Sequence, residues 1–297
     1  MEGAEFIGSH LVEKLAKRGY RVIVVDNLLR GKLDNLSSVL DKIKFVKGDI
    51  RNYELMEELI KNSEVVFHLA SLSRVIPSIE NPELCFRINI DGTEIIARLC
   101  SKYHKKLIFS SSREVYGTAK YIPVDEDHPL NPENPYGASK VSGEKIIEAY
   151  AKNYELSYVI LRLTNVYGPR DFDRVTPIFV ENAMKGKDLV VYGTDKILDF
   201  VYINDVIEAF VRAIDLNENQ TLNIGSGMGT SILELAKLIN KKIATESESI
   251  IVKEKRKGEV DKFVANIERA GRILKWKPKT TLEEGITRTI ESYKSMH

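Results

Sequence analysis

The chain carries the stretch SSSREVYG at 110–117 and, a little further on, YGASK at 136–140. We predict a strand over 106–110 that delivers Ser112 at its end. Asn134-Pro135 is typical of a helix start, with an N-cap residue followed by proline at the first helical position. In such a helix Tyr136 and Lys140 are four residues apart and lie on one face. The two stretches therefore predict a strand end and a helix start that share one site.

Tyr136 and Lys140 together form a candidate proton-transfer pair. A free phenol has a pKa of about 10 and is a poor base at neutral pH. A lysine ammonium beside the phenol favours the phenolate and lowers that pKa, and the Ser112 hydroxyl can share the proton. The result is a base suited to a sugar or alcohol hydroxyl. Taken alone, the spacing equally describes a surface tyrosine beside a solvated lysine, so the assignment depends on the rest of the chain.

The bulk composition excludes several classes of protein. Lysine and arginine number 44 against 43 aspartate and glutamate in 297 residues, which gives no sign of a nucleic-acid or membrane partner. Cys85 and Cys100 fall in one predicted helix and indicate reduced core thiols in a cytoplasmic protein. The five histidines form no metal-ligand pattern. The sequence has no signal peptide and no apolar run long enough to span a bilayer.

Apolar runs alternate with helical patterns over much of the chain. We predict strands over 21–25, 43–46, 64–68, 106–110, 157–162 and 221–224, and helices over 6–18, 81–103 and 135–154. This alternation is typical of an α/β fold with a parallel, doubly wound sheet. Beyond Val166 the pattern is less regular. There, capping boxes at Ser231–Glu234 and Thr281–Glu284 predict the starts of two late helices.

Further short blocks are spread in order along nearly the whole chain. Besides the two stretches above, they are FIGSH at 6–10, VDN at 25–27, GDI at 48–50, HLA at 68–70, NIDGT at 89–93, LRLTNVYGPR at 161–170 and NIG at 223–225. With these blocks the sequence resembles the extended short-chain dehydrogenase/reductase family. Within that family it is similar to the NAD-dependent epimerases and dehydratases of the UDP-glucose 4-epimerase type.

The resemblance implies a Rossmann-like fold with a smaller, interleaved C-terminal substrate domain. It assigns 1–167 to an NAD-binding domain, to which about 198–227 returns. It assigns 168–197 and 228–297 to a sugar-nucleotide-binding domain. It also implies NAD as a bound cofactor, a UDP-sugar as substrate, and a homodimer formed through the long helices 82–103 and 135–154.

The resemblance also implies where the cofactor binds. Asp26 ends a predicted strand, where an acidic side chain accepts hydrogen bonds from a ribose 2′-hydroxyl and repels a 2′-phosphate, so NAD is favoured over NADP. A turn aspartate is the other interpretation of Asp26. The implied cofactor-binding residues are Gly3, Phe6, Ile7, Gly8, Asp26, Asn27, Asp49, Ile50, Leu69, Ala70, Ser71, Asn89, Ser110, Tyr136 and Lys140.

The start of the chain departs from the family pattern. The phosphate-binding turn of the family reads GGAGFIG, whereas residues 2–8 read EGAEFIG, so Glu2 and Glu5 stand at glycine positions. A glutamate Cβ blocks the close backbone approach that glycine allows, and its carboxylate opposes a pyrophosphate. The central first strand of the family is absent, and its loss leaves a slot about 9–10 Å wide. Three explanations stay open: missing upstream residues, a weakly binding relative, or another segment in the slot.

The resemblance implies Ser112, Tyr136 and Lys140 as the catalytic residues of an epimerisation at C4. Tyr136 as phenolate removes the 4-hydroxyl proton with Ser112 as relay, hydride moves from C4 to NAD, and the 4-keto sugar turns over before hydride returns. Lys140 also holds the nicotinamide ribose. The implied substrate-binding residues are Ser112, Tyr116, Asn165, Arg170, Arg174, Arg256 and Phe263. Arginine suits a diphosphate, and the Phe263 ring favours a hydroxyl over an N-acetyl group at C2 of the sugar.

Several positions differ from the 4-epimerase pattern. Leu198 replaces a phosphate-binding arginine, Asn266 replaces an aspartate, and Arg113-Glu114 replace small residues. Related dehydratases and decarboxylases carry an acid at the position of Glu114, but Arg113 occupies the place of the first acid that a dehydratase needs. The predicted enzyme is an NAD-dependent UDP-glucose/UDP-galactose 4-epimerase. A 4,6-dehydratase or decarboxylase that uses Glu114 is one alternative, and a non-catalytic sugar-nucleotide-binding protein with impaired NAD binding is another.

Overall fold

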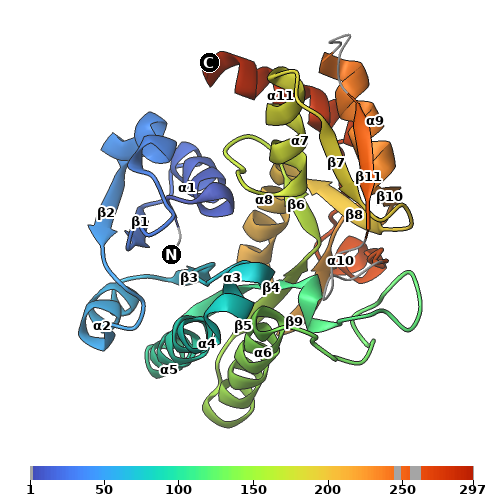
Figure 1. The fold of residues 1–297 in the computed structure, drawn as a ribbon. Coiled ribbons are helices and arrows are strands. Elements are labelled where there is room, and N and C mark those ends of the chain that lie inside the picture. Colours follow the sequence, from blue (N-terminus) through green and yellow to red (C-terminus); the bar gives the residue numbers. More distant parts are fainter. Residues whose placement is uncertain (1–2, 244–248, 255–261, 297) are drawn as a thin grey trace.

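The computed structural model describes residues 3–243, 249–254 and 262–296 (Figure 1). A four-stranded parallel sheet in the order β3-β4-β5-β9 lies at its centre. Its strands are β3 (Val65–His68), β4 (Lys106–Ser112), β5 (Tyr158–Leu163) and β9 (Gln220–Ile224). Consecutive residues of β4 and β5 are buried, as expected for a parallel sheet with helices on both faces. The predicted α/β fold is therefore confirmed.

Two long helices pack side by side along this sheet (Figure 1). The first runs through α4 (Pro82–Phe86), η2 (Arg87–Asp91) and α5 (Gly92–Lys102), and the second is α6 (Pro135–Tyr154). The Asn81 and Asn134 side chains each accept a hydrogen bond from a backbone amide of the first turn, so both predicted helix starts are confirmed. The middle segment, η2, is π-helical, a local widening that is frequent near functional sites.

The N-terminal strands form a separate sheet. Among the strands that the structure describes, β1 (Val22–Asp26) pairs only with β2 (Ile43–Lys47), in parallel. The helices around them are α1 (Phe6–Lys17), η1 (Leu33–Lys42) and α2 (Tyr53–Lys61). Within the described residues no strand lies between β1 and β3. The sheet is split at the place predicted for the missing strand, and no described segment fills the slot.

The rest of the chain forms two small sheets and their helices. β8 (Ile197–Tyr202) pairs with β6 (Asn165–Tyr167) and β10 (Gly229–Ser231), and β7 (Leu189–Tyr192) pairs with β11 (Ile250–Lys253). The remaining helices are α3 (Val75–Glu80), η3 (Arg113–Val115), α7 (Val175–Met184), α8 (Ile203–Arg212), η4 (Ala213–Asp215), α9 (Ile232–Ile243), α10 (Glu268–Ile273) and α11 (Leu282–Met296). Both predicted capping boxes form, with reciprocal hydrogen bonds.

Chain segments cross between the two parts of the molecule, as predicted. After β8, helix α8 packs on α1 and strand β9 joins the main sheet. The buried carboxylate of Asp199 in β8 accepts hydrogen bonds from the backbone amides of Ser226, Gly227 and Ala265. It therefore ties the end of β9 to the substrate side. The domain boundaries themselves stay a prediction.

Other expectations concern what the molecule lacks. Across the described residues no helix is both long and apolar enough to cross a bilayer, and no cluster of metal-ligating side chains is present. Cys85 and Cys100 are buried free thiols, as predicted, and burial raises the pKa of the Cys100 thiol. A cytoplasmic location stays a prediction.

A buried ion pair fastens α6 to the central strands. The Arg162 guanidinium on β5 donates to both carboxylate oxygens of Glu144 on α6, at 2.6 Å for the shortest pair of atoms. Ser111 on β4 donates its hydroxyl proton to the same carboxylate, and Arg162 also donates to the Tyr116 hydroxyl oxygen. Both charged side chains are almost wholly buried. Each charge is thus compensated only as long as the other remains.

Removing one member of this pair is expected to be costly. Glu144→Ala leaves a buried guanidinium without its carboxylate and should lower the free energy of unfolding by about 3–5 kcal/mol. The control is Glu148→Ala on the same helix, whose pair with Lys145 is exposed to solvent and should contribute under about 1 kcal/mol. Urea unfolding of the three proteins measures both. Equal losses in the two variants would contradict this account.

Candidate active site

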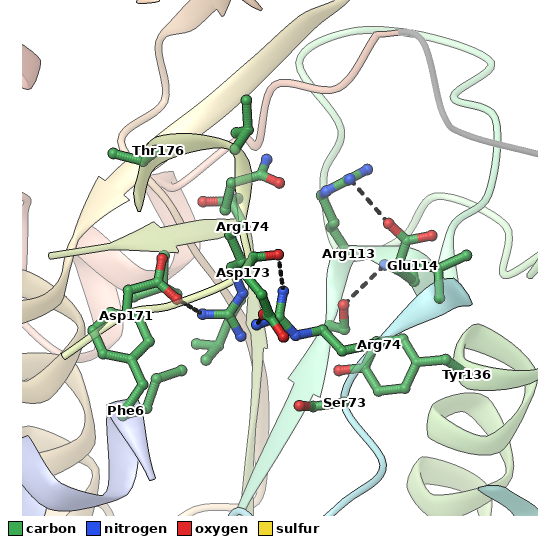
Figure 2. A pocket seen from close by; sticks show the side chains of 18 of the residues that line it. Phe6, Ser73, Arg74, Arg113, Glu114, Tyr136, Asp171, Asp173, Arg174 and Thr176 are labelled. Atoms are coloured by element: carbon green, nitrogen blue, oxygen red, sulfur yellow. Dashed lines mark hydrogen bonds and ion pairs between the residues drawn. The ribbon is translucent and has the colours of Figure 1, made fainter. Parts of the chain in front are cut away.

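A pocket of about 480 Å³ opens at the carboxyl ends of β3, β4 and β5 (Figure 2). Parallel sheets bind ligands at this edge. The wall opposite the sheet comes from the segment 171–176 and from the small sheets that contain β7 and β8. The pocket therefore lies between the two parts of the molecule, where a cofactor and a substrate could meet.

The structure brings Ser112, Tyr136 and Lys140 together in this pocket. Tyr136 and Lys140 lie in the first two turns of α6, and the Tyr136 side chain is 9% exposed. The buried Lys140 ammonium donates to the backbone carbonyl of Ser110 at 2.9 Å and lies 5.7 Å from the centre of the Tyr136 ring. Ser112 ends β4, and its hydroxyl oxygen accepts a hydrogen bond from the Glu114 amide. Tyr136 and Lys140 therefore share one face of α6, and Ser112 lines the same pocket, as the spacing predicted.

Asn89 lies outside the pocket lining, and its side chain stabilises the wall of the pocket. It is buried in the π-helical segment η2. Its side-chain oxygen accepts from the Leu72 amide at 2.7 Å, and its nitrogen donates to the Ser139 hydroxyl at 2.8 Å. Asn89 therefore joins the loop after β3 to the helix turn that carries Tyr136 and Lys140.

The predicted cofactor residues divide into two groups. Those that line the pocket are Phe6, Ile7, Gly8, Leu69, Ser71, Ser110, Tyr136 and Lys140. Those outside its lining are Gly3, Asp26, Asn27, Asp49, Ile50, Ala70 and Asn89. The second group includes Asp26, which was expected to bind a ribose hydroxyl of the cofactor. Among them, Asp49 forms an ion pair with Arg51 at 2.7 Å, and this guanidinium lowers the pKa of the carboxyl.

The Asp26 side chain stabilises the backbone turn before α1 through hydrogen bonds. Its buried carboxylate accepts from the amides of Ala4 and Leu28, at 2.9 and 2.8 Å. The interpretation as a turn aspartate is therefore confirmed. The contact with a ribose stays a prediction, since Asp26 lies outside the pocket lining.

Glu5 lies at the N-terminus of α1 and lines the pocket. Its carboxylate, 9% exposed, accepts from the Arg30 guanidinium at 2.8 Å. Arg30 also reaches Asp173 across the pocket mouth at 3.4 Å. A helix N-terminus is an anion site, so Glu5 brings a negative charge to the place of a pyrophosphate, and Arg30 balances it. Glu2 lies outside the described residues.

NAD therefore fits the two halves of this site unequally. At the nicotinamide end, Tyr136, Lys140 and Ser110 surround space that apolar Leu69 helps to enclose. At the phosphate end, the Glu5 carboxylate opposes the ligand, while Arg30 supplies a compensating cation. The end with Tyr136 and Lys140 holds the predicted catalytic residues together, and the end with Glu5 departs from the family pattern.

Arg74, in the pocket wall, was missed by the sequence analysis, whereas Arg174 was named. Arg74 donates to the Phe172 carbonyl at 2.7 Å and pairs with Asp173, and Arg174 pairs with Asp171 at 2.9 Å (Figure 2). Burial lowers the pKa of Arg74 to about 10, so it stays charged at neutral pH. Burial raises the pKa of the Asp171 carboxyl to about 6. The available signal was the position of Arg74, just after a strand end at the edge where ligands bind.

Arg113 and Glu114 form an ion pair inside the pocket. Their side chains point toward one another and meet at 2.9 Å (Figure 2). The second oxygen of Glu114 accepts from the Asn134 side chain at 3.0 Å, next to the start of α6. The carboxylate of Glu114 is therefore engaged on both sides.

The predicted substrate-binding residues also fall into those that line the pocket and those that do not. Ser112, Asn165 and Arg174 line the pocket, and so does Leu198 at the position of the missing arginine. Arg256 lies outside the described residues.

Three other predicted substrate residues point elsewhere. Tyr116 and Phe263 are fully buried and stack 5.8 Å apart, because the Tyr116 hydroxyl donates to Asn223 behind the pocket. Arg170 pairs with Glu13 of α1 at 2.9 Å. These three side chains lie outside the pocket lining, and their contact with a substrate stays a prediction.

Comparisons with known proteins agree with this geometry. A family model described as GDP-mannose 4,6 dehydratase matches residues 3–289. A putative UDP-glucose 4-epimerase of Methanocaldococcus jannaschii is 40% identical over 99% of this chain and 97% of its own length. A UDP-N-acetyl-alpha-D-glucosaminuronate decarboxylase of Bacillus cytotoxicus is 32% identical over 99% and 96%.

Solved structures match equally broadly. The UDP-glucose 4-epimerase of Thermotoga maritima, solved with UDP-glucose, has a TM-score of 0.95 and 37% identity, over 99% of this chain and 97% of that one. The UDP-glucose 4-epimerase of Thermus thermophilus, in complex with NAD, has a TM-score of 0.91 and 31% identity, over 99% and 98%. This chain therefore belongs to the NAD-dependent epimerase/dehydratase family of short-chain dehydrogenases/reductases, whose cofactor is NAD.

Proposed function

We propose that this chain is a nucleotide-sugar 4-epimerase that interconverts UDP-glucose and UDP-galactose. The observation that carries the proposal is the meeting of Ser112, Tyr136 and Lys140 in one pocket, on the ends of β4 and α6. Relatives named as UDP-glucose 4-epimerases over nearly the full length of the chain support it.

Each of the three residues has a distinct role in the proposed reaction. Tyr136 takes the proton from the 4-hydroxyl of the sugar, and Ser112 hydrogen-bonds the same oxygen. Lys140 is fixed by the Ser110 carbonyl, and its charge favours the phenolate form of Tyr136. NAD, when bound, supplies the acceptor and donor of the hydride at C4. Tyr136 then returns the proton once the sugar has presented its other face.

The cationic wall of the pocket suits the diphosphate of the substrate. Arg74, just before α3, and Arg174, just before α7, line the pocket together with Asn165. Arginine binds phosphate oxygens through paired N–H groups. Asp171 and Asp173 hold the two guanidinium groups in place. We propose that these groups bind the diphosphate where Leu198 cannot.

A 4,6-dehydratase or decarboxylase is the second candidate, and Glu114 is the observation that favours it. Its carboxylate lines the pocket near Tyr136. A dehydratase needs an acid free to protonate a leaving hydroxyl. The contacts of Glu114 with Arg113 and Asn134 hold its carboxylate on both sides instead, so the epimerase is preferred.

The first test is the product formed from UDP-galactose. Without added NAD, the purified protein should form UDP-glucose, identified by nuclear magnetic resonance. Tyr136→Phe should lower turnover by at least about 100-fold, the usual contribution of a general base, and should leave the bound NAD unchanged. Tyr121→Phe, at an exposed tyrosine whose hydroxyl contacts Asp125, is the matched control. A 4-keto-6-deoxy sugar as the product would refute the epimerase.

The second test concerns the charge at the phosphate end. Glu5→Gly removes the carboxylate and restores the small residue of the family pattern. It should raise the NAD that each chain retains through purification, measured after denaturation. Glu5→Gln separates the charge from the bulk of the side chain, and Arg30→Ala should lower the NAD retained because Glu5 then loses its cation. The same NAD content in all four proteins would show that Glu5 does not oppose the cofactor.

The predicted homodimer is proposed on the surface of the long helices. Ile76, Ile79 and Phe86 lie on α3 and α4, beside α6, with 38–55% of their surface exposed. Such side chains gathered on one surface are typical of an interface. Light scattering should therefore give the mass of two chains, and Ile79→Glu with Phe86→Glu should give the mass of one. A monomeric parent protein would rule out this interface.

A further inference from the structure

The segment 170–174 crosses the wall of the pocket that lies opposite the sheet, and we call it the strap. It follows β6 and leads into α7. The strap residues that line the pocket are Asp171, Asp173 and Arg174 (Figure 2). Phe6, in the first turn of α1, and Tyr136, at the catalytic end, line the same pocket. A dinucleotide that reaches from the phosphate turn to Tyr136 therefore passes along the strap.

The backbone of the strap has an unfavourable conformation at two positions. Arg170 and Asp173 have positive φ angles of 66° and 54°. These angles lie in the left-handed region, which glycine adopts more readily than any other residue. Side-chain-bearing residues keep such angles where surrounding contacts impose them. The shape of the strap thus depends on the groups that its side chains contact.

Asp173 pairs with two arginines that come from other parts of the molecule. Arg74, just before α3, pairs with one carboxylate oxygen and also donates to the Asp173 carbonyl at 3.2 Å (Figure 2). Arg30, in the turn after β1, approaches the other carboxylate oxygen at 3.4 Å. One carboxylate therefore joins the strap to the N-terminal unit and to the loop after β3, across the pocket mouth.

Glu5 extends this set of contacts to the phosphate turn. Its carboxylate pairs with Arg30 at 2.8 Å. Negative and positive groups thus alternate along a row of four side chains, which are Glu5, Arg30, Asp173 and Arg74. Each group in such a row is attracted to its neighbours. Glu5 therefore has a second effect besides opposing the cofactor, because it holds Arg30 where Arg30 meets Asp173.

The two ends of the strap are held unequally. The Asp173 side chain is 52% exposed and that of Arg30 is 25% exposed, and ion pairs with such exposure contribute little and are weakened by salt. Asp171 is buried, its carboxylate pairs with Arg174, and its carbonyl accepts from the Tyr293 hydroxyl on α11. Release of Asp173 therefore frees one edge of the strap while the Asp171 end stays attached.

We propose that the strap controls the exchange of the dinucleotide, with Asp173 as its latch. While Asp173 is paired with Arg30 and Arg74, the strap closes the pocket mouth. When Asp173 is released, the strap moves aside and the cofactor enters or leaves. A gate changes the rates of entry and release by the same factor, so it leaves the dissociation constant unchanged. The inference concerns the cofactor alone and does not depend on which sugar is the substrate.

The test compares the release of NAD from the complete chain and from Asp173→Asn. Asparagine keeps the size of the side chain and adopts the left-handed conformation readily, so the fold should persist while both ion pairs lose their charge. Tritiated NAD should leave the variant at least about 5-fold faster in the presence of excess unlabelled NAD, the size expected from two partly exposed pairs. The dissociation constant for NADH, from fluorescence titration, should equal that of the parent.

Asp127→Asn is the matched control. Asp127 is an exposed aspartate that pairs with Arg269 and lies outside the pocket lining, so this variant should release NAD at the parent's rate. Hydrogen exchange of peptides that cover 170–176 should be faster in Asp173→Asn than in the parent and the control. Such a difference places the motion in the strap.

Three results would overturn the proposal. Equal rates of NAD release from Asp173→Asn and the parent would show that the latch does not control exchange. Faster release with an equal rise in the dissociation constant would make Asp173 a residue that holds the cofactor rather than a gate. Faster release without faster hydrogen exchange in the strap would place the controlling motion elsewhere.

Discussion

The hydrogen bond from the Lys140 ammonium to the Ser110 carbonyl is the contact on which the catalytic end of the molecule depends. It joins α6 to β4 at the edge of the sheet, and it holds a buried charge beside the Tyr136 ring. One turn further along the helix, Glu144 and Arg162 fasten the same elements in the core. Because buried charges need their partners, the helix cannot shift along the strand without leaving a charge unpaired. The relative position of Ser112, Tyr136 and Lys140 follows from this constraint.

The phosphate end is built on weaker constraints. The phosphate turn belongs to a two-stranded sheet that no described strand joins to the main one. Ion pairs cross the gap instead, from Arg30 to Asp173 and from Arg170 to Glu13. These pairs are partly exposed, and such pairs contribute little to stability. The two ends of the pocket thus differ in how they are connected. Backbone pairing joins the strands of the main sheet, whereas the packing of α1 on α8 and partly exposed ion pairs hold the phosphate turn.

Local signals in the sequence predicted the framework well. Asn134-Pro135 and the capping boxes at Ser231 and Thr281 act within one helical turn, so they could be read without knowledge of the fold. Side-chain direction was harder to predict. Tyr116 was expected in the pocket, but Arg162 and Asn223, distant in sequence, bind its hydroxyl from behind. Arg74 was missed because its pairing with Asp173 depends on how two remote loops approach each other. The pairing of Glu5 with Arg30 was likewise invisible, since it needs the turn after β1 to fold back.

The central claim is that hydride leaves C4 of the sugar and returns to the same carbon. Its most direct test uses UDP-galactose with deuterium at C4, turned over in ordinary water, with the label located by nuclear magnetic resonance. The account predicts UDP-glucose that carries the full label at C4. Deuterium at C6 would reveal a dehydratase, and loss of the label to water would exclude a returning hydride.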